Sequence, residues 1–86
     1  MAKVKLLYFA SLRQKIGLPE EDVTPPADVR DVKGLIDWLI TRGPEYEAAF
    51  ENREVIRAAI DQEHAALDAP LGTPHEVAFF PPVTGG

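Results

Sequence analysis

The chain has 86 residues, of which 45% are hydrophobic and 27% charged, so it predicts one small domain with little room for a deep active site. Its formal net charge of -5 and lack of a Lys/Arg cluster argue against nucleic-acid binding, which needs cations to neutralise phosphates. Because the chain has no cysteine, a disulfide, a cysteine-ligated zinc site and a thiol nucleophile are excluded.

The chain begins with a predicted strand over residues 3–10. Hydrophobic side chains alternate along it, so that Val4, Leu6 and Tyr8 share one face. Phe9 falls on the other face, together with two lysines. These lysines interrupt the apolar positions, so no signal peptide is expected, and no apolar run reaches the length of a membrane helix. We therefore expect a cytoplasmic protein without membrane contact.

A short helix and a short strand are expected next. Ser11 is predicted to cap a helix that runs through Ile16, and Gly17 is its stop signal. Residues 21–24 suit a short strand, which two prolines end because proline lacks the donor that a sheet ladder needs.

The main helix is predicted to begin after Asp31, whose side chain suits an N-cap. Arg42 and Gly43 supply exit signals, and Trp38 lies at the edge of the apolar stripe. Residues 44–50 suggest one or two further helical turns. The apolar stripe is assigned to the core and consists of Val32, Leu35, Ile36, Leu39 and Ile40.

The last third predicts two strands. Residues 55–60 form the first, with Arg57 pointing outward, and residues 61–64 are expected to be a turn. After a longer loop, residues 75–80 form the final strand, in which Phe80 shares the less buried face. If the first and last strands are neighbours, Phe9 and Phe80 form one exposed apolar patch, a feature typical of protein interfaces.

The C-terminal run VAFFPPVTGG, residues 77–86, is the most informative segment. Its two prolines hold the chain extended and keep it from continuing the sheet, while Gly85 and Gly86 lack side chains and suit a narrow channel. An extended segment from Pro81 to the last residue reaches on the order of 20 Å. We interpret the terminal carboxylate as the functional group.

Three segments together resemble the small, sulfur-carrier subunit of molybdopterin synthase: VKLLYFA at 4–10, AAIDQ at 58–62 and EVAFFPPVTGG at 76–86. The resemblance implies an α+β, ubiquitin-like β-grasp fold, in which one main helix packs on one face of a small mixed sheet. Residues 1–80 then form the domain and residues 81–86 a flexible tail. The implied protein is a non-catalytic sulfur donor that works in a hetero-oligomer with a larger synthase subunit.

In that family, an ATP-dependent E1-like enzyme adenylates the terminal carboxylate, here that of Gly86. Sulfur from a sulfur donor protein then displaces AMP and leaves a thiocarboxylate, which donates its sulfur to a cyclic pterin precursor in the large subunit. The resemblance implies no permanently bound cofactor, because ATP belongs to the activating enzyme; the chain itself has no phosphate-binding loop. No cysteine is needed for this chemistry.

The resemblance assigns the site residues as follows. Gly86 carries the sulfur and Gly85 threads the channel, while Phe9 and Phe80 match apolar positions that face the partner. His64 stands where the family has a third apolar residue, and its charge is expected to weaken an apolar contact. His75 receives no role, and the two histidines lack the spacing of a metal site. The tail residues expected to contact the partner are Pro81, Pro82, Val83 and Thr84.

Two alternatives remain open. A ubiquitin-like modifier, or a sulfur carrier of another pathway such as thiazole synthesis, would use the same terminal activation. A plain β-grasp interaction module would have incidental terminal glycines. A stand-alone hydrolase or transferase ranks last, because the Asp, Glu, Ser and His residues form no recognisable pair of nucleophile and base.

Overall fold

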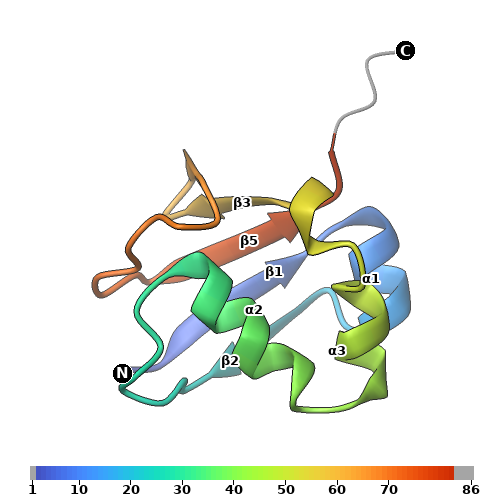
Figure 1. Ribbon diagram of the computed structural model, residues 1–86, viewed down its shortest axis with the longest axis horizontal. Helices are drawn as coiled ribbons and strands as arrows, with labels where there is room; N and C mark the ends of the chain where they lie inside the picture. The colour runs from blue at the N-terminus through green and yellow to red at the C-terminus, as the bar shows by residue number, and fades with distance from the viewer. Residues whose placement is uncertain (1, 83–86) are drawn as a thin grey trace.

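The computed structural model describes residues 2–82. Five strands form one sheet in the order β2-β1-β5-β3-β4, and the helices pack on one of its faces (Figure 1). None of the helices in residues 2–82 is long and apolar enough to cross a membrane. The elements in chain order are β1 (Val4–Tyr8), α1 (Ala10–Ile16), β2 (Glu20–Val23), α2 (Val32–Ile40), α3 (Pro44–Ala49), the 3-10 helix η1 (Arg53–Val55), β3 (Arg57–Ile60), β4 (Glu63–Ala65) and β5 (Glu76–Phe80).

The last strand, β5, lies in the middle of the sheet. It pairs in parallel with β1, where Leu6 faces Val77, and antiparallel with β3, where Ala58 faces Phe79. The predicted adjacency of the first and last strands is therefore confirmed. Because the two strands that flank β5 supply ladder partners on both sides, the chain segment that precedes the C-terminal tail is held firmly in the sheet.

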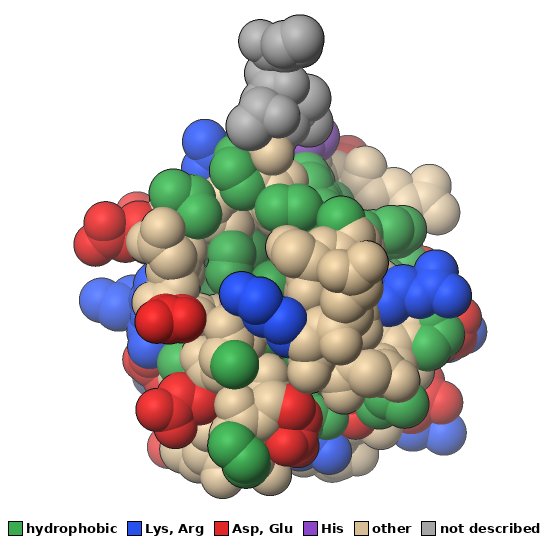
Figure 2. Space-filling view, turned by 90° about the vertical axis from the view of Figure 1, so that its right-hand side faces the viewer, with side chains coloured by type: hydrophobic (Ala, Val, Ile, Leu, Met, Phe, Trp, Pro, Cys, Tyr) green, Lys and Arg blue, Asp and Glu red, His purple; other side chains and the backbone are tan. Residues whose placement is uncertain are grey.

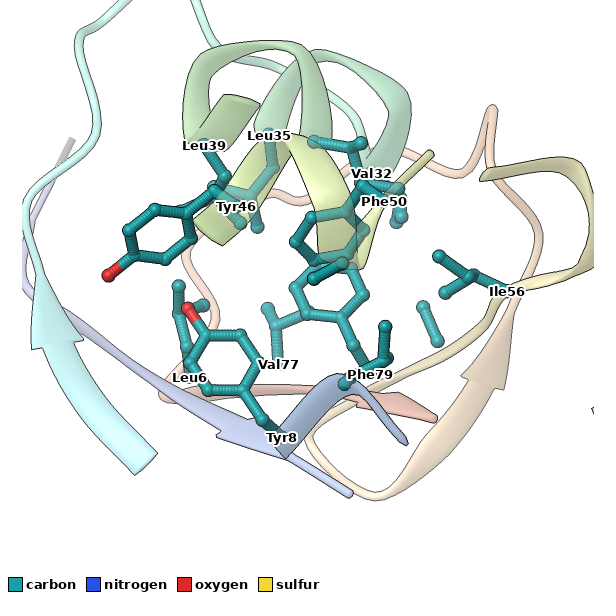
Figure 3. Close-up of a cluster of buried hydrophobic side chains, with 14 of the residues drawn as sticks. Leu6, Tyr8, Val32, Leu35, Leu39, Tyr46, Phe50, Ile56, Val77 and Phe79 are labelled. Atoms are coloured by element: carbon teal, nitrogen blue, oxygen red, sulfur yellow. The ribbon is translucent and has the colours of Figure 1, made fainter. Parts of the chain in front are cut away.

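The core lies between the sheet and the helices. Side chains of Leu6 and Val77 point from the sheet toward Leu35 and Leu39 of α2 (Figure 3). The ring of Phe79 meets that of Phe50 edge-on, with centroids 5.2 Å apart. The predicted stripe is confirmed: four of its residues are fully buried, and Ile40 packs partly buried against the same cluster.

The start of α2 agrees with the prediction, but its end does not. The Asp31 carboxylate accepts the backbone N–H of Gly34 at 2.7 Å, as an N-cap does. The helix ends at Thr41 in a right-handed conformation, so Gly43 is not its stop. Gly43 instead precedes Pro44, which occupies the first position of α3 and suits it because proline fixes φ near the helical value.

The start of α1 differs from the prediction, because Ser11 does not cap it. The N-cap is Phe9, without a side-chain hydrogen bond, and its carbonyl accepts the N–H of Leu12 at 3.1 Å. The chain turns at Ala10, whose φ of 52° places it in the left-handed region. Ser11 therefore lies inside the helix. At the other end Gly17 is the stop, with φ 89°, as predicted.

Two boundaries in the last third also differ. Val55 belongs to η1 rather than to a strand, and β3 begins at Arg57. The turn predicted over residues 61–64 is shorter than expected. It consists of Asp61 and Gln62, whose φ angles are 48° and 72°. Two successive residues with positive φ are what a tight hairpin turn requires, so the chain returns at once as β4. This strand was not predicted.

A polar cluster fastens the edge strand β2 to the helices. The Tyr8 and Tyr46 hydroxyls donate to the same Glu21 oxygen, at 2.8 and 2.7 Å, and Arg42 pairs with its other oxygen at 3.1 Å. Burial, and then the Glu21 carboxylate, raise the pKa of Tyr8 well above its ordinary value and that of Tyr46 to about 12. Both hydroxyls therefore remain protonated donors at neutral pH. The guanidinium of Arg42 also lies 5.3 Å from the ring centroid of Trp38, which packs at the helix edge as expected.

This mixed five-stranded sheet with α2 packed across one face is the β-grasp, ubiquitin-like arrangement that the resemblance implied. Within the described residues 2–82, the other face of the sheet carries no helix. We call it the open face and define it by the alternation of the paired strands. Its residues are Lys5, Leu7, Glu20, Asp22, Arg57, Ala59, His64, Glu76, Ala78 and Phe80.

Candidate functional site

The described chain ends just beyond β5, at two prolines. Pro81 and Pro82 are half-buried and directly follow the strand (Figure 1). Since proline has no N–H, Pro81 ends the ladder of β5 in the way the sequence predicted. The remaining tail residues of the predicted site, Val83, Thr84, Gly85 and Gly86, lie outside the described residues. Their assigned roles stay predictions.

The two prolines border a small hollow. Its volume is about 120 Å³, and its other walls come from α1 and from the segment that follows α3. Hydrophobic side chains gather at this end of the molecule (Figure 2). Val55 is 41% exposed and lines this hollow together with the prolines. The sequence predicts a strand at Val55 and does not indicate this position. The lining residues are Ser11, Leu12, Lys15, Ala49, Glu51, Asn52, Val55, Ile56, Pro81 and Pro82.

Phe9 lies at the same end of the sheet. Its backbone N–H donates to the carbonyl of Phe79 at 3.1 Å, which fixes Phe9 beside the C-terminal end of β5. Phe9 is 49% exposed, as the prediction of an exposed partner-facing ring requires. However, it lies just after β1 rather than within it, because the strand ends at Tyr8.

Phe80 and His64 are brought together on the open face. Their ring centroids are 5.6 Å apart, and the ring planes are nearly perpendicular, at 89°. His64 occupies the centre of β4, paired with Ala59, rather than the turn that was predicted. Phe80 is half-buried and His64 packs against its ring, so this ring is less exposed than strand parity alone predicts.

The part of the open face next to the Phe80 and His64 rings consists of small side chains. Ala78 pairs with Leu7 on one side and with Ala59 on the other, and the two alanines are 8% and 9% exposed. Leu7 and His64 are the next residues of this row on either side, and Glu20 of the edge strand follows Leu7. The open face next to the tail is therefore a shallow apolar surface, whose chemistry suits contact with another protein rather than catalysis.

His75 lies apart from this surface, before β5 begins. Its backbone N–H and that of Glu76 both donate to the Asp61 carboxylate, at 2.9 and 3.0 Å. These two hydrogen bonds hold the start of β5 against the turn that follows β3. Across residues 2–82, no three His, Asp or Glu side chains come together in a way that would hold a metal ion.

Comparison with known proteins gives a consistent answer. A model of the ThiS family matches residues 6–86. The molybdopterin synthase sulfur carrier subunit of Escherichia coli is 36% identical over 83 residues, which cover 96% of this chain and 99% of that protein. Its counterpart from Mycobacterium tuberculosis is 34% identical over 91 residues, with full coverage of both chains.

Solved structures agree in fold. A Pyrococcus furiosus protein assigned as molybdopterin converting factor, subunit 1, is 28% identical with a TM-score of 0.74, covering 96% of this chain and all of that one. The crystal structure of small archaeal modifier protein 1 from Haloferax volcanii is 26% identical with a TM-score of 0.71, covering 99% of this chain and all of that one. The family match over residues 6–86, with this likeness in sequence and fold, establishes that the chain is a member of the ThiS family.

Proposed function

We propose that this chain is the sulfur carrier subunit of a molybdopterin synthase, and that its sulfur is carried on the C-terminal carboxyl carbon of Gly86. The observation that carries the proposal is the end-to-end similarity to curated carrier subunits, which includes nearly the whole length of both chains. The absence of cysteine agrees with it, because the sulfur must then be carried on something other than a side-chain thiol.

The proposed chemistry has three steps. The Gly86 carboxylate attacks the α-phosphorus of ATP in an E1-like activating enzyme, forming an acyl-adenylate and releasing pyrophosphate. A reduced sulfur nucleophile, supplied through a sulfur donor protein, attacks the acyl carbon and displaces AMP to leave a thiocarboxylate. In the large synthase subunit that sulfur attacks a carbon of the pterin precursor and displaces an oxygen leaving group from it. Water then cleaves the bond between the acyl carbon and sulfur, which restores the Gly86 carboxylate and leaves the sulfur on the pterin. Two such transfers build the dithiolene, so the carrier is a consumable donor and the large subunit supplies the catalytic groups.

The arrangement around the end of β5 supports this role. The tail starts from a strand that is paired on both sides, at the end of the molecule where Phe9, Phe80 and the two prolines lie. A partner that accepts residues 83–86 in a narrow channel would rest on this apolar surface. Docking of the domain would then fix the depth to which Gly86 enters the partner's active site.

Intact-mass spectrometry of the purified chain tests the proposal. After incubation with ATP, the cognate activating enzyme and a sulfur donor, the mass is expected to rise by the difference between one sulfur and one oxygen atom. The thiocarboxylated chain should then form dithiolene when it is mixed with the large synthase subunit and its cyclic pterin precursor. An unchanged mass would reject the carrier role, and a correct mass without dithiolene would reject this pathway.

A second candidate function is that of a protein modifier. It is favoured by the likeness to small archaeal modifier protein 1, at a TM-score of 0.71 and 26% identity. A modifier would end as an isopeptide between Gly86 and a lysine of another protein, so the same mass measurements on cell extracts separate the two functions. Free thiocarboxylate supports the carrier, and conjugates abolished by removal of Gly86 support the modifier.

Truncation of Phe80 is expected to weaken binding to the large synthase subunit. Phe80→Ala removes the aromatic ring that lies next to the tail, and a central aromatic contact of this kind contributes about 1 to 3 kcal/mol. Titration calorimetry with the large subunit measures the loss. Phe80→Leu is the matched control and should retain most of the affinity, because it keeps an apolar side chain. Equal affinity of Phe80→Ala and the unmodified chain would exclude this ring from the interface.

A further inference from the structure

Two cationic or polar side chains flank Phe80 on the open face. Arg57 is its direct partner in the antiparallel pair of β3 and β5. His64, on the next strand, meets the same ring edge-on at 5.6 Å. Because Ala59 pairs with His64 and lies two residues from Arg57 along β3, Arg57 and His64 are diagonal neighbours on one face. The apolar ring next to the tail is therefore bordered by two nitrogen-bearing groups.

Neither group finds an acceptor within residues 2–82. The ion pairs in this part of the chain use Lys5, Arg42 and Arg53, and its side-chain hydrogen bonds do not include Arg57 or His64. Their shared neighbour on this face is Ala59, whose side chain has no hydrogen-bond acceptor. Both groups are exposed.

A partner that covers Phe80 must also cover these two groups. Removing a guanidinium from water is strongly unfavourable unless it regains hydrogen bonds and an opposite charge, and an imidazole N–H also needs an acceptor. A carboxylate meets both needs, since it accepts two parallel bonds from a guanidinium and has lone pairs left for a further donor. A purely apolar partner surface would leave both groups unsatisfied.

We propose that Arg57 and His64 form a receiving site for an acidic side chain of the partner, set beside the apolar contact that Phe80 makes. This inference rests on the proposed function, because it takes the large synthase subunit as the partner. The placement of the cations on the open face supports it. At the end away from the tail, Lys5 lies between Asp22 and Glu76 and forms an ion pair with Glu20. Arg57 lies beside Phe80 at the tail end and has no such partner within residues 2–82, so it is the cation available to a partner's carboxylate.

Binding of the large synthase subunit to single variants tests the site. Arg57→Leu and His64→Leu are each expected to weaken binding by about tenfold, and Arg57→Glu by about 30-fold or more, because the partner's carboxylate loses its donor or meets a like charge. If the interface were only apolar, the two leucine variants would instead bind the large subunit more tightly than the unmodified chain. Raising the salt concentration should weaken binding of the unmodified chain more than that of Arg57→Leu.

Lys33→Glu is the matched control, because it makes the same charge reversal at an exposed position on α2, on the other side of the sheet. It should change affinity by less than about twofold if long-range charge effects are screened. Unchanged or tighter binding of both leucine variants overturns the receiving site and leaves the carrier function intact. If the unmodified chain itself does not bind the large subunit, the proposed function fails and the inference falls with it. Thermal unfolding of each variant should match the unmodified chain, since neither side chain is buried.

Discussion

Removal of Gly86 is expected to abolish sulfur transfer while leaving the stability of the domain unchanged. The deletion moves the terminal carboxylate one residue back along the tail, by about 3.3 Å. Misplacement of a reacting atom by about 1 Å already costs on the order of 100-fold in rate, so no turnover should be detectable. Terminal residues beyond a domain contribute little to its core, so the unfolding midpoint should not change. Dithiolene formation and thermal unfolding of the same preparation measure the two effects.

Lys33→Ala serves as the control for this deletion, because Lys33 is exposed on α2 and the change preserves the length of the tail and its terminal glycines. It should retain measurable thiocarboxylate formation and sulfur transfer. Persistent activity without Gly86 would show that the acyl carbon of this residue is not the sulfur carrier. A large drop in unfolding temperature would show instead that the tail is a structural part of the domain.

Glu21→Ala is expected to lower the free energy of unfolding by about 2 to 4 kcal/mol. The substitution removes the shared acceptor of the Tyr8 and Tyr46 hydroxyls and the partner of Arg42. An unsatisfied buried donor costs about 1 to 3 kcal/mol, and the Tyr8 and Tyr46 side chains are 1% and 6% exposed. Since small domains are stable by only about 5 to 15 kcal/mol, urea unfolding should show a clear shift of midpoint.

The neighbouring residue on β2 provides the comparison. Glu20 is also an acidic residue of the edge strand, but it points to the open face and pairs with Lys5 at 3.4 Å in an exposed ion pair. Glu20→Ala should therefore change the free energy of unfolding by less than about 1 kcal/mol. Equal losses in the two variants would mean that Glu21 acts only through surface charge. Glu20 and Glu21 are adjacent in β2 and point to opposite faces of the sheet, so one carboxylate is exposed to solvent and the other supports the fold.

The parts of the fold that could be predicted from sequence are those set by hydrophobic periodicity and by local capping. The alternation in β1 and β5, the stripe of α2 and the Asp31 cap each depend on residues a few positions apart, so the spacing carries the information. Gly17 was recognised for the same reason, because a positive φ at the end of a helix is mostly met by glycine.

Other features depend on contacts that spacing does not encode. β4 has three residues, no hydrophobic alternation, and a preceding turn of Asp61 and Gln62 without glycine, so the sequence predicts only a turn over residues 61–64. Glu21 was placed in a strand, but its partners lie 13 to 25 residues away in sequence. The alternation along residues 55–60 predicts that Val55 begins a strand, whereas it ends one turn of 3-10 helix.

The sequence also predicts only part of the candidate site, namely the residues whose positions follow from which strands are neighbours. Strand adjacency correctly brings Phe9 and Phe80 to the end of the sheet where the tail starts. Strand parity is less reliable here, because Phe9 lies beyond β1 as the N-cap of α1 and Phe80 is half-buried. The role proposed for Arg57 was missed, although its outward direction had been predicted, because only the antiparallel pairing of β3 and β5 brings it next to Phe80. Likewise, the contact between His64 and Phe80 requires the unpredicted strand β4.

The position of β5 also has a mechanical consequence. A pull on the C-terminal residues along the strand would load two ladders at once in shear, one with β1 and one with β3. Several hydrogen bonds in each ladder would have to break together, which resists force better than opening them one after another. Under the proposed function, the force that arises when the tail leaves a partner's channel would therefore be carried by both ladders of β5 together.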